Sequence, residues 1–328
     1  MSDSPTPAVD LHAVEEAAAR LRDVAVETPL ITNHALDAHT GGRVLLKPEC
    51  LQRTGSFKIR GAYNLMSQLD AAARTSGVVA WSSGNHAQGV AAAGSMLGIR
   101  TAIVMPEDAP RAKIENTRRL GGETVLYDRH TGDREQIARA LAAERGAALV
   151  PSYEHEHIIA GQGTVGLEIV RQLGSAGADQ VLIPCSGGGL SSGCAIAIRA
   201  LSPGTAVYAV EPRDFDDTRR SLEAGRRVSI DTRASSICDA LQVATPGRMT
   251  FDLNRELLAG GLVVSDDEVR EAMRFAFREL KLVVEPGGAV GLAAVLAGRI
   301  DCRDRTTVVV LSGGNVDSAL FADIQQAD

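Results

Sequence analysis

The chain has 328 residues, of which 45% are hydrophobic, only 3% are aromatic and 33 are glycines. This length predicts one large domain or two medium ones with true hydrophobic cores. The net charge of −7 at pH 7, without any cluster of Lys and Arg, argues against a nucleic-acid partner. The composition favours an α/β enzyme that acts on a small molecule.

The cysteines and the apolar runs predict where the protein resides. Five cysteines are scattered along the chain without a Cys-x-x-Cys pair, namely Cys50, Cys185, Cys194, Cys238 and Cys302. This pattern favours reduced thiols over a disulfide or metal set. The first residues lack the features of a signal peptide, and no apolar run reaches the roughly 18 residues of a membrane helix. We therefore expect a cytoplasmic protein without a membrane partner.

Strand and helix patterns alternate along most of the chain. After a first helix over residues 11–26, capped by Asp10, the apolar run 42–48 predicts a strand that leads into a helix over 60–69. Further strands are expected at residues 78–81, 101–105, 124–127, 181–184, 207–210 and 306–311. Further helices are expected at residues 87–97, 110–120, 134–145, 163–173, 191–201 and 266–280. Residues 226–247 lack periodicity and predict an ordered loop near the site.

This alternation predicts mostly parallel sheets, because each crossover between parallel strands needs a helix. Ligands of such sheets bind beyond the carboxyl ends of the strands. The unusual segments all follow predicted strands: Ser82–His86, Ser186–Leu190, Glu211–Asp217 and Ser312–Asn315.

Lysine is rare in this chain, and one lysine has unusual surroundings. The four lysines are Lys47, Lys58, Lys113 and Lys281. A lysine amine can become neutral and form a Schiff base with an aldehyde, whereas an arginine guanidinium cannot. Lys58 lies between a Thr-Gly-Ser segment and a predicted helix, where the helix dipole would help to keep its amine uncharged. The alternative is an ordinary exposed lysine.

A glycine-rich segment between a strand and a helix predicts an anion-binding turn. It consists of Ser186, Gly187, Gly188, Gly189 and Leu190. Backbone N–H groups and the helix dipole can converge there on one phosphate. The dinucleotide pattern G-x-G-x-x-G fails at Ser192, and no G-x-x-x-x-G-K-[ST] run exists, so a cofactor with a single phosphate fits better. A tight turn used only for packing is the alternative.

The loop Ser82-Ser83-Gly84-Asn85-His86 offers hydroxyl, amide and N–H groups at a predicted helix start. Such a loop is suited to hold a substrate carboxylate, although a helix cap explains it as well. For His86, a structural hydrogen bond is a better explanation than a role as general base.

Two further segments offer ligand groups. Ser312, at the end of the last predicted strand, could place a hydroxyl against a ring nitrogen without keeping that nitrogen protonated. The carboxylates of Glu211, Asp214, Asp216 and Asp217 are suited to Mg²⁺ or Ca²⁺, and a solvated acidic loop is the alternative.

Taken together, S-F-K-I-R-G at residues 56–61, S-S-G-N-H at 82–86, the glycine turn and S-G-G-N at 312–315 make the chain resemble the fold-type II pyridoxal-phosphate (PLP) enzymes. The resemblance is to the serine/threonine dehydratase and serine racemase branch, and it runs from about residue 11 to the C-terminus. It implies an α/β fold like that of the tryptophan synthase β subunit, with two open, twisted, mostly parallel sheets. A large PLP-binding domain would comprise residues 1–67 and 155–328, and a small mobile domain residues 68–154.

The resemblance also implies how the cofactor is held. Lys58 would form the imine with PLP, and Phe57 would lie against the cofactor. Asn85 would face the 3′-oxygen of the ring, and Ser312 would meet the pyridine nitrogen. The phosphate would rest on Ser186, Gly187, Gly188, Gly189 and Leu190.

Substrate and metal positions are implied in the same way. Ser83 would stand opposite Lys58 as a second acid/base. The substrate carboxylate would be held by Ser82, Ser83, Gly84, Asn85 and His86. A divalent cation, Mg²⁺, Mn²⁺ or Ca²⁺, would be bound by Glu211, Asp217 and the carbonyl of Phe215. Members of the family are usually homodimers.

Two segments depart from the family pattern, Arg213-Asp214-Phe215 and Asp239-Ala240. Relatives commonly carry smaller, less charged residues at the first and Asp-Gly at the second. Both departures bear on the choice of substrate rather than on the cofactor.

The sequence thus predicts a PLP-dependent ammonia-lyase that converts L-threonine or L-serine to a 2-oxo acid and ammonia, with Lys58 removing the Cα proton. Two alternatives use the same scaffold. One is dehydration of 3-hydroxyaspartate, with Arg134 as a candidate cation for the second carboxylate, and the other is racemisation of serine. A non-catalytic binding protein is a third alternative, but the joint presence of Lys58, Ser83 and Ser312 speaks against it.

Overall fold

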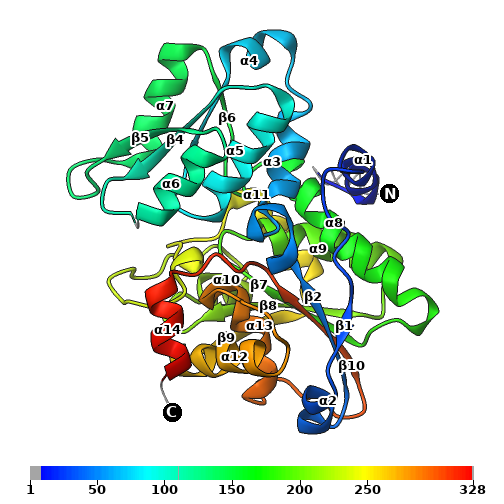
Figure 1. The fold of residues 1–328 in the computed structure, drawn as a ribbon. Helices are drawn as coiled ribbons and strands as arrows, with labels where there is room; N and C mark the ends of the chain where they lie inside the picture. Colours follow the sequence, from blue (N-terminus) through cyan, green and yellow to red (C-terminus); the bar gives the residue numbers. More distant parts are fainter. Residues whose placement is uncertain (1–8, 110, 327–328) are drawn as a thin grey trace.

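The computed structural model describes residues 9–109 and 111–326, which form two lobes with one β-sheet each (Figure 1). The predicted architecture, an α/β fold with two open and mostly parallel sheets, is confirmed. The four strands of the smaller sheet all lie between residues 78 and 149. The division into domains at residues 68 and 154 stays a prediction.

The larger sheet has the strand order β1-β2-β10-β7-β8-β9. Every neighbouring pair is parallel except β1 with β2. The last strand in chain order, β10, therefore lies inside the sheet between two strands that come much earlier. The strands are β1 (Ile31–Thr32), β2 (Arg43–Pro48), β7 (Gln180–Pro184), β8 (Ala206–Pro212), β9 (Gly260–Val264) and β10 (Thr306–Leu311).

The smaller sheet has the strand order β5-β4-β3-β6, and its strands are all parallel. They are β3 (Val78–Trp81), β4 (Thr101–Pro106), β5 (Glu123–Tyr127) and β6 (Ala148–Leu149).

Helices cover the faces of both sheets (Figure 1). The α-helices are α1 (Leu11–Arg20), α2 (His34–Thr40), α3 (Lys58–Met66), α4 (Ala71–Ser76), α5 (Asn85–Leu97), α6 (Arg111–Arg119), α7 (Arg134–Arg145), α8 (Glu156–Leu173), α9 (Gly189–Leu201), α10 (Asp217–Ala224), α11 (Arg248–Leu257), α12 (Asp266–Arg278), α13 (Pro286–Leu296) and α14 (Ser318–Gln326). Short 3₁₀ turns are η1 (Glu49–Leu51), η2 (Arg53–Gly55), η3 (Gly174–Ala176) and η4 (Asp239–Leu241).

The larger sheet is buried on both faces, which explains its unbroken apolar strands. In β10, Val308 and Val310 pack with residues of α8 and α9. The alternate residues Val309 and Leu311 pack on the opposite face with residues of α12 and α13. Side chains of a strand point alternately to the two faces, so one run of valines serves two cores.

Glycines allow three helices to approach closely beside the larger sheet. In α8, a Cβ added at Gly161 would lie 2.7 Å from the carbonyl oxygen of Arg60 in α3. A Cβ at Gly166 would lie 2.6 Å from the carbonyl oxygen of Cys194 in α9. Backbone thus meets backbone at these crossings, and α3 is held directly against the core of the larger lobe.

The predicted element boundaries differ from the structure at several places. The first helix ends at Arg20, although its predicted cap is confirmed, since Asp10 accepts from the N–H of Ala13 at 2.9 Å. Helix α8 begins at Glu156, seven residues before the predicted start at 163. Its glycines lower the intrinsic helix propensity, and tertiary packing overrides that loss. Strand β9 was not predicted, because it opens with two glycines.

Two further features concern the helices and the cysteines. Within the described ranges, no helix is both long and apolar enough to cross a membrane. The five cysteines all lie in those ranges and are free thiols, four of them buried.

Candidate active site

Three of the predicted segments meet at one edge of the larger sheet. The segment of Lys58 follows β2, the turn of Ser312 follows β10, and the glycine turn follows β7. These three strands are neighbours in the order β2-β10-β7, so their carboxyl ends lie side by side. The backbone N–H of Phe57 donates to the carbonyl oxygen of Ser312 at 3.2 Å, and the N–H of Gly314 donates to that of Gly55 at 2.9 Å.

Lys58 is the first residue of α3, at a helix N-terminus as predicted. Its Nζ donates to the carbonyl oxygen of Ser152 at 3.0 Å and lies 5.2 Å from the ring centre of Phe57. Burial lowers the pKa of the amine to about 8, against an opposing effect of the nearby Glu285 charge. A substantial neutral fraction therefore exists near pH 8, which a nucleophilic amine requires.

The other three lysines have ordinary structural surroundings. Lys47 is buried and pairs with Glu168 at 2.6 Å, and Lys113 pairs with Asp239 at 2.6 Å. Lys281 is exposed and donates to a backbone carbonyl of the preceding turn. Among the described ion pairs, none involves the amine of Lys58.

The glycine turn has the geometry of an anion cradle. Gly188 has φ +92°, in the left-handed region, and is the N-cap of α9. A Cβ added at Gly187 would lie 2.3 Å from the ring of Tyr153, so no other residue fits there. The hydroxyl of Thr250 donates to the carbonyl oxygen of Gly187 at 2.6 Å. The N–H groups of residues 187–190 themselves have no acceptor in the described part of the chain, as is usual at a helix N-terminus.

The Ser82–His86 loop joins β3 to α5 in the smaller lobe. Ser82 Oγ accepts from the N–H of Gly84 at 3.1 Å, and the N-cap of α5 is Gly84, without a side-chain cap. A Cβ added at Gly84 would meet nothing within 4 Å. Ser83 is half-buried beside this open space. The loop can thus admit a small ligand.

His86 forms a structural hydrogen bond from the same loop. Its Nε2 lies 2.8 Å from the carbonyl oxygen of Val150, just beyond β6. Burial, together with the charge of Lys58, lowers the pKa of His86 to about 3. The imidazole is therefore neutral at physiological pH and holds the end of β6 against α5.

Asn85 links the smaller lobe to the larger one. Its Nδ2 donates to Glu285 Oε1 at 2.5 Å, and its Oδ1 accepts from Asn315 Nδ2 at 2.7 Å. Burial raises the pKa of Glu285 to about 7, and the charge of Asp239 acts in the same direction. The hydrogen bond from Asn85 opposes this rise.

The acidic segment after β8 is only partly arranged as a metal site. The carboxylate of Glu211 accepts from the N–H groups of Thr218 at 2.9 Å and Arg219 at 2.8 Å. Asp217 is buried, and neither of its carboxylate oxygens has a hydrogen-bond partner among the described residues. Burial raises the pKa of Asp217 to about 7, and burial beside Asp217 raises that of Glu211.

Two other residues of this segment have different roles. Asp214 is exposed, whereas Asp216 pairs with two arginines of α10. In the part of the chain that the structure describes, no three His, Cys, Asp or Glu side chains are placed to hold a metal ion.

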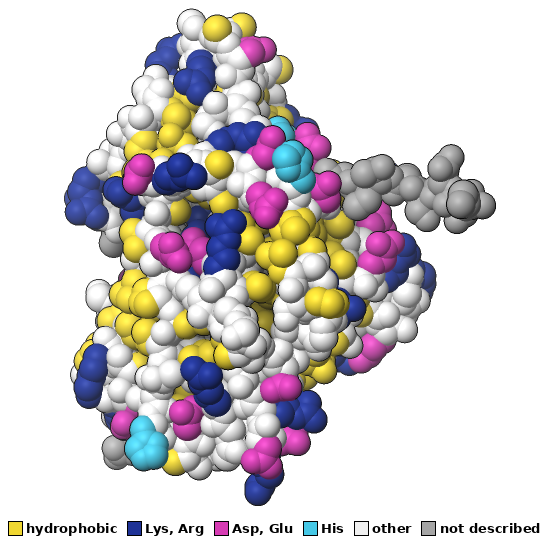
Figure 2. Space-filling model, turned by 90° about the vertical axis from the view of Figure 1, so that its right-hand side faces the viewer, with side chains coloured by type: hydrophobic (Ala, Val, Ile, Leu, Met, Phe, Trp, Pro, Cys, Tyr) yellow, Lys and Arg dark blue, Asp and Glu magenta, His cyan; other side chains and the backbone are white. Residues whose placement is uncertain are grey.

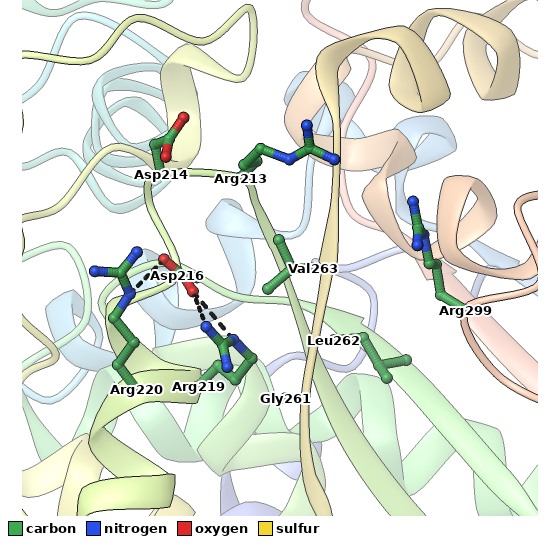
Figure 3. A pocket seen from close by; sticks show the side chains of 9 residues that line it. All are labelled: Arg213, Asp214, Asp216, Arg219, Arg220, Gly261, Leu262, Val263 and Arg299. Atoms are coloured by element: carbon green, nitrogen blue, oxygen red, sulfur yellow. Dashed lines mark hydrogen bonds and ion pairs between the residues drawn. The ribbon is translucent and has the colours of Figure 1, made fainter.

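Next to this segment lies an open cavity of about 440 Å³ lined by Arg213, Asp214, Asp216, Arg219, Arg220, Gly261, Leu262, Val263 and Arg299 (Figure 3). Asp216 pairs with Arg219 at 2.5 Å and with Arg220 at 2.8 Å, and Arg299 pairs with Glu268. Three of the four arginines that line the cavity are thus ion-paired. None of the lysine, loop or turn residues described above lines this cavity.

Several residues of the site were not predicted from the sequence. Glu285 lies outside every segment singled out above, although a Glu directly before Pro-Gly-Gly at a helix start was a usable signal. Tyr153 and the carbonyl of Ser152 gave no signal, because nothing local links residue 153 to residue 187. The role of Asn315 depends equally on contacts across the fold.

A pyridoxal-phosphate group fits this arrangement. The cradle of N–H groups can hold its phosphate, and a buried amine of lowered pKa stands at the same edge of the sheet. The sequence profile of the family described as "Pyridoxal-phosphate dependent enzyme" matches residues 21–313. The chain belongs to this family, and the predictions of a fold-type II PLP enzyme and of an enzyme rather than a binding protein are confirmed.

Its relatives define a narrower group. The chain is 47% identical to an L-threo-3-hydroxyaspartate ammonia-lyase of Pseudomonas sp., over 95% of this chain and 97% of the relative. It is 44% identical to a solved threonine deaminase from T.th., with a TM-score of 0.87 over 94% of this chain and 99% of that one. Maize serine racemase is 36% identical, with a TM-score of 0.91 over 96% of each chain.

Proposed function

We propose that the chain catalyses PLP-dependent β-elimination on a β-hydroxy-α-amino acid, yielding a 2-oxo acid and ammonia. The observation that carries this proposal is that a buried amine of lowered pKa, after β2, and an anion cradle, after β7, lie at the same edge of the sheet on either side of β10. Relatives that are ammonia-lyases support the reaction type.

In this proposal, Lys58 holds the cofactor covalently and Phe57 lies against it. The N–H groups of the turn from Ser186 through Gly187, Gly188 and Gly189 to Leu190 would hold the phosphate, Asn85 would hold the ring oxygen, and Ser312 would hold the ring nitrogen. When bound, PLP supplies a conjugated, electron-poor system that makes the substrate Cα–H acidic.

The chain's own residues then move protons and hold the substrate. Residues 82–86 bind the substrate carboxylate through N–H and hydroxyl groups, and the open space beside Gly84 supports this role. Once the substrate amine has replaced it on the cofactor, Lys58 Nζ would take the Cα proton and could return a proton to the β-hydroxyl, which would leave as water. Ser83 is the second acid/base, on the face opposite Lys58. Water re-enters when the product hydrolyses, so the net reaction is release of ammonia.

We further propose that residues 68–154 form a small domain that closes over the substrate, and that residues 1–67 and 155–328 form the PLP-binding domain. The arrangement of the two sheets supports this division. The carboxylate loop and the phosphate turn lie in different lobes, so closure would bring substrate and cofactor together.

For the substrate, we propose L-threo-3-hydroxyaspartate beside L-threonine and L-serine. The identities of 47% to a hydroxyaspartate ammonia-lyase and 44% to a threonine deaminase do not by themselves identify the substrate. A second carboxylate needs a cation, and Arg134, at the start of α7, is exposed. Burial raises the pKa of Tyr153, and the nearby charge of Arg134 opposes that rise. Because Tyr153 packs on the glycine turn, the charge of Arg134 acts on a residue that borders the proposed phosphate site.

The decisive experiment on the proposal maps the cofactor. Borohydride reduction of the holoenzyme, followed by digestion and mass spectrometry, should place the label on the peptide that contains Lys58. The K58A variant should lose the label and turnover, whereas K281A, at an exposed lysine, should keep both. A label on any other lysine contradicts the proposal.

A substrate panel separates the candidate reactions. Turnover of L-threonine, L-serine and both hydroxyaspartate diastereomers should be compared, with chiral analysis of residual serine to detect racemisation. The R134A variant should lose at least tenfold in kcat/KM for hydroxyaspartate and much less for threonine. R111A, at an exposed arginine of α6, is the control. Equal losses for both substrates would mean that Arg134 does not contact the second carboxylate.

We also propose a divalent cation at Asp217, Glu211 and the carbonyl of Phe215. The two unpartnered oxygens of buried Asp217 support it, since a cation would relieve that desolvated charge. Mg²⁺, Mn²⁺ or Ca²⁺ should raise the melting temperature of the wild type over an EDTA-treated sample, and D217N should abolish the increment. D214N, at an exposed carboxylate, should retain it. An unchanged increment in D217N would exclude this site.

A homodimer is the proposed assembly, and a reducing, cytoplasmic environment the proposed location. Leu51 and Val283 are 53% and 44% exposed. They belong to segments that converge on Gly314. Hydrophobic side chains also gather across the middle of the face drawn in Figure 2. Such patches are typical of interfaces.

Sedimentation analysis should give about twice the chain mass of 34.5 kDa, and L51D should shift the measured mass to that of the monomer. The free thiols support the location.

A further inference from the structure

The amide of Asn85 has a defined orientation, which can be derived from a backbone carbonyl. Asn315 Nδ2 donates to the carbonyl oxygen of Thr54 at 2.7 Å, and a carbonyl can only accept. The same Nδ2 lies 2.7 Å from Asn85, so the Asn85 atom that faces it must be the acceptor, Oδ1. The other end of the amide, Nδ2, consequently faces Glu285, at 2.5 Å from Oε1.

This orientation leaves one donor unused. An amide nitrogen carries two hydrogens, and Glu285 accepts one of them. No other described residue accepts the second hydrogen. Asn85 is the first residue of α5 and directly follows the N-cap Gly84, where the space is open. The free N–H is therefore available to a ligand, while the amide oxygen is turned toward Asn315.

The surrounding backbone is built around this contact. A Cβ added at Gly313 would lie 2.2 Å from Glu285 Oε1 and 3.1 Å from Asn85 Nδ2, so the pair fits only against a glycine. The N–H of Glu285 donates to the carbonyl oxygen of Gly313 at 3.0 Å. Gly313 directly follows Ser312, so the pair is tied to the turn that is proposed to meet the ring nitrogen.

Glu285 is also a costly residue to keep in this position. It is 5% exposed, and the described groups that favour its charged form are the hydrogen bond from Asn85 and the charges of Lys113 and Lys58. A buried carboxylate with so few partners destabilises a fold relative to an apolar or neutral side chain. Its presence is explained if it serves the site rather than stability.

We propose that Glu285 and Asn315 are positioning residues, which lock the Asn85 amide so that its second N–H points to the bound cofactor. This inference rests on the proposed function, because it assumes that PLP occupies the site. Glu285 acts by accepting from Nδ2 and Asn315 by donating to Oδ1, and neither needs to touch the cofactor. Loss of either partner lets the amide rotate or flip, which would present an acceptor to the ring oxygen.

A double-mutant cycle tests this inference through cofactor affinity. Apoprotein variants N85A, E285A, N315A and the double variant N85A/E285A are titrated with PLP, and the dissociation constant is read from visible absorbance. N85A, E285A and N315A should each raise Kd at least tenfold. If Glu285 acts through Asn85, E285A should add less than twofold in the N85A background.

Controls separate positioning from folding. E285Q keeps an acceptor oxygen for Asn85 and should recover most of the affinity that E285A loses. Q180A removes a buried hydrogen-bonding side chain at the opposite end of the sheet and should leave Kd unchanged. The melting temperature of each apoprotein reports on the fold. If E285A does not fold, E285Q and N315A complete the comparison.

The outcomes distinguish this inference from the proposed function. If the wild-type apoprotein does not bind PLP at Lys58, the proposed function fails. If the wild type binds PLP but E285A and N315A bind it equally well, only the positioning role is wrong. A full additive loss in N85A/E285A would also overturn it, because Glu285 would then act independently of Asn85.

Discussion

The side chains of this site owe their properties to burial more than to their immediate partners. Burial is the largest cause of the lowered pKa of Lys58 and of the raised pKa of Glu285. In both cases burial disfavours the charged form, so the pKa of the lysine falls and the pKa of the glutamate rises. The resulting pKa values, about 8 and about 7, are closer together than those of a free lysine and glutamate. Small changes of pH near neutrality therefore alter the charge of the site.

His86 should make stability depend on pH in a recognisable window. Its pKa is about 3 in the folded protein, against 6.5 for an exposed histidine. Below about pH 6.5 the unfolded chain binds a proton that the folded chain does not, so acidification favours unfolding. The free energy of unfolding should fall by up to about 1.4 kcal/mol per pH unit from this one group between pH 6.5 and 3.

The measurement compares denaturant unfolding at several pH values in this window for the wild type and for H86Q. The slope contributed by this group should disappear in H86Q, whereas H12Q should retain it, since His12 is exposed. An unchanged slope in H86Q would show that other groups dominate acid unfolding.

At the scale of elements, the site is built from the ends of helices and strands. The turn before α9 needs a glycine at residue 188 for two reasons, a φ of +92° and the proximity of Thr250 and Asn254, whose atoms would lie 2.9 Å from an added Cβ. A left-handed backbone alone disfavours an L-residue by about 1–2 kcal/mol.

We therefore expect G188A to weaken PLP binding at least tenfold and to lower the melting temperature. G225A is a matched control, because Gly225 has φ +64° and open space around it. It should lower stability slightly and leave PLP affinity unchanged. Equal behaviour of the two variants would mean that backbone strain, and not the shape of the turn, is the whole effect.

The ion pair between Lys113 of α6 and Asp239 of η4 joins the two lobes at 2.6 Å. Asp239 is well exposed, so the pair stabilises closure by no more than about 1 kcal/mol. D239N should raise KM by up to about fivefold, with little change in kcat. In the wild type KM should rise with salt, while in D239N it should not. D231N, at an exposed ion pair outside the lobe contact, is the control.

The elements that the sequence predicted well are those whose patterns arise locally. The valines of β10 and the apolar run of β7 are buried on both faces, and their continuous hydrophobicity identifies them. The start of α8 was missed because Gly161, which lies in its unpredicted first part, serves a close contact with α3 rather than helix propensity. Strand β9 was missed because its Gly261 packs under Arg219 of another element.

For the whole molecule, the motifs predicted which segments meet but not how they are held together. Lys58, Ser312 and the glycine turn follow strands, and the rule for parallel sheets brings their ends to one edge. The links through Glu285, Asn315 and Tyr153 join residues that are far apart in sequence, and no local pattern encodes such contacts. These contacts therefore cannot be predicted from a single sequence.

Cofactor binding should stabilise the entire chain, because the phosphate turn and Lys58 belong to the core of the larger lobe. Free PLP at 100 times its Kd stabilises the folded state by about 2.7 kcal/mol, which for a chain of this length raises the melting temperature by about 4 °C. An analogue that carries the phosphate but lacks the aldehyde should give only part of this shift. If the analogue matched PLP, the covalent bond would contribute nothing to stability.

The central position of β10 has a consequence for biosynthesis. This strand pairs with β2 on one side and β7 on the other, yet it is synthesised after both. A nascent chain that has not reached residue 306 exposes two hydrophobic strand edges with nothing between them. Such edges are prone to pairing with other chains, and the sheet of the larger lobe cannot be completed before β10 emerges from the ribosome.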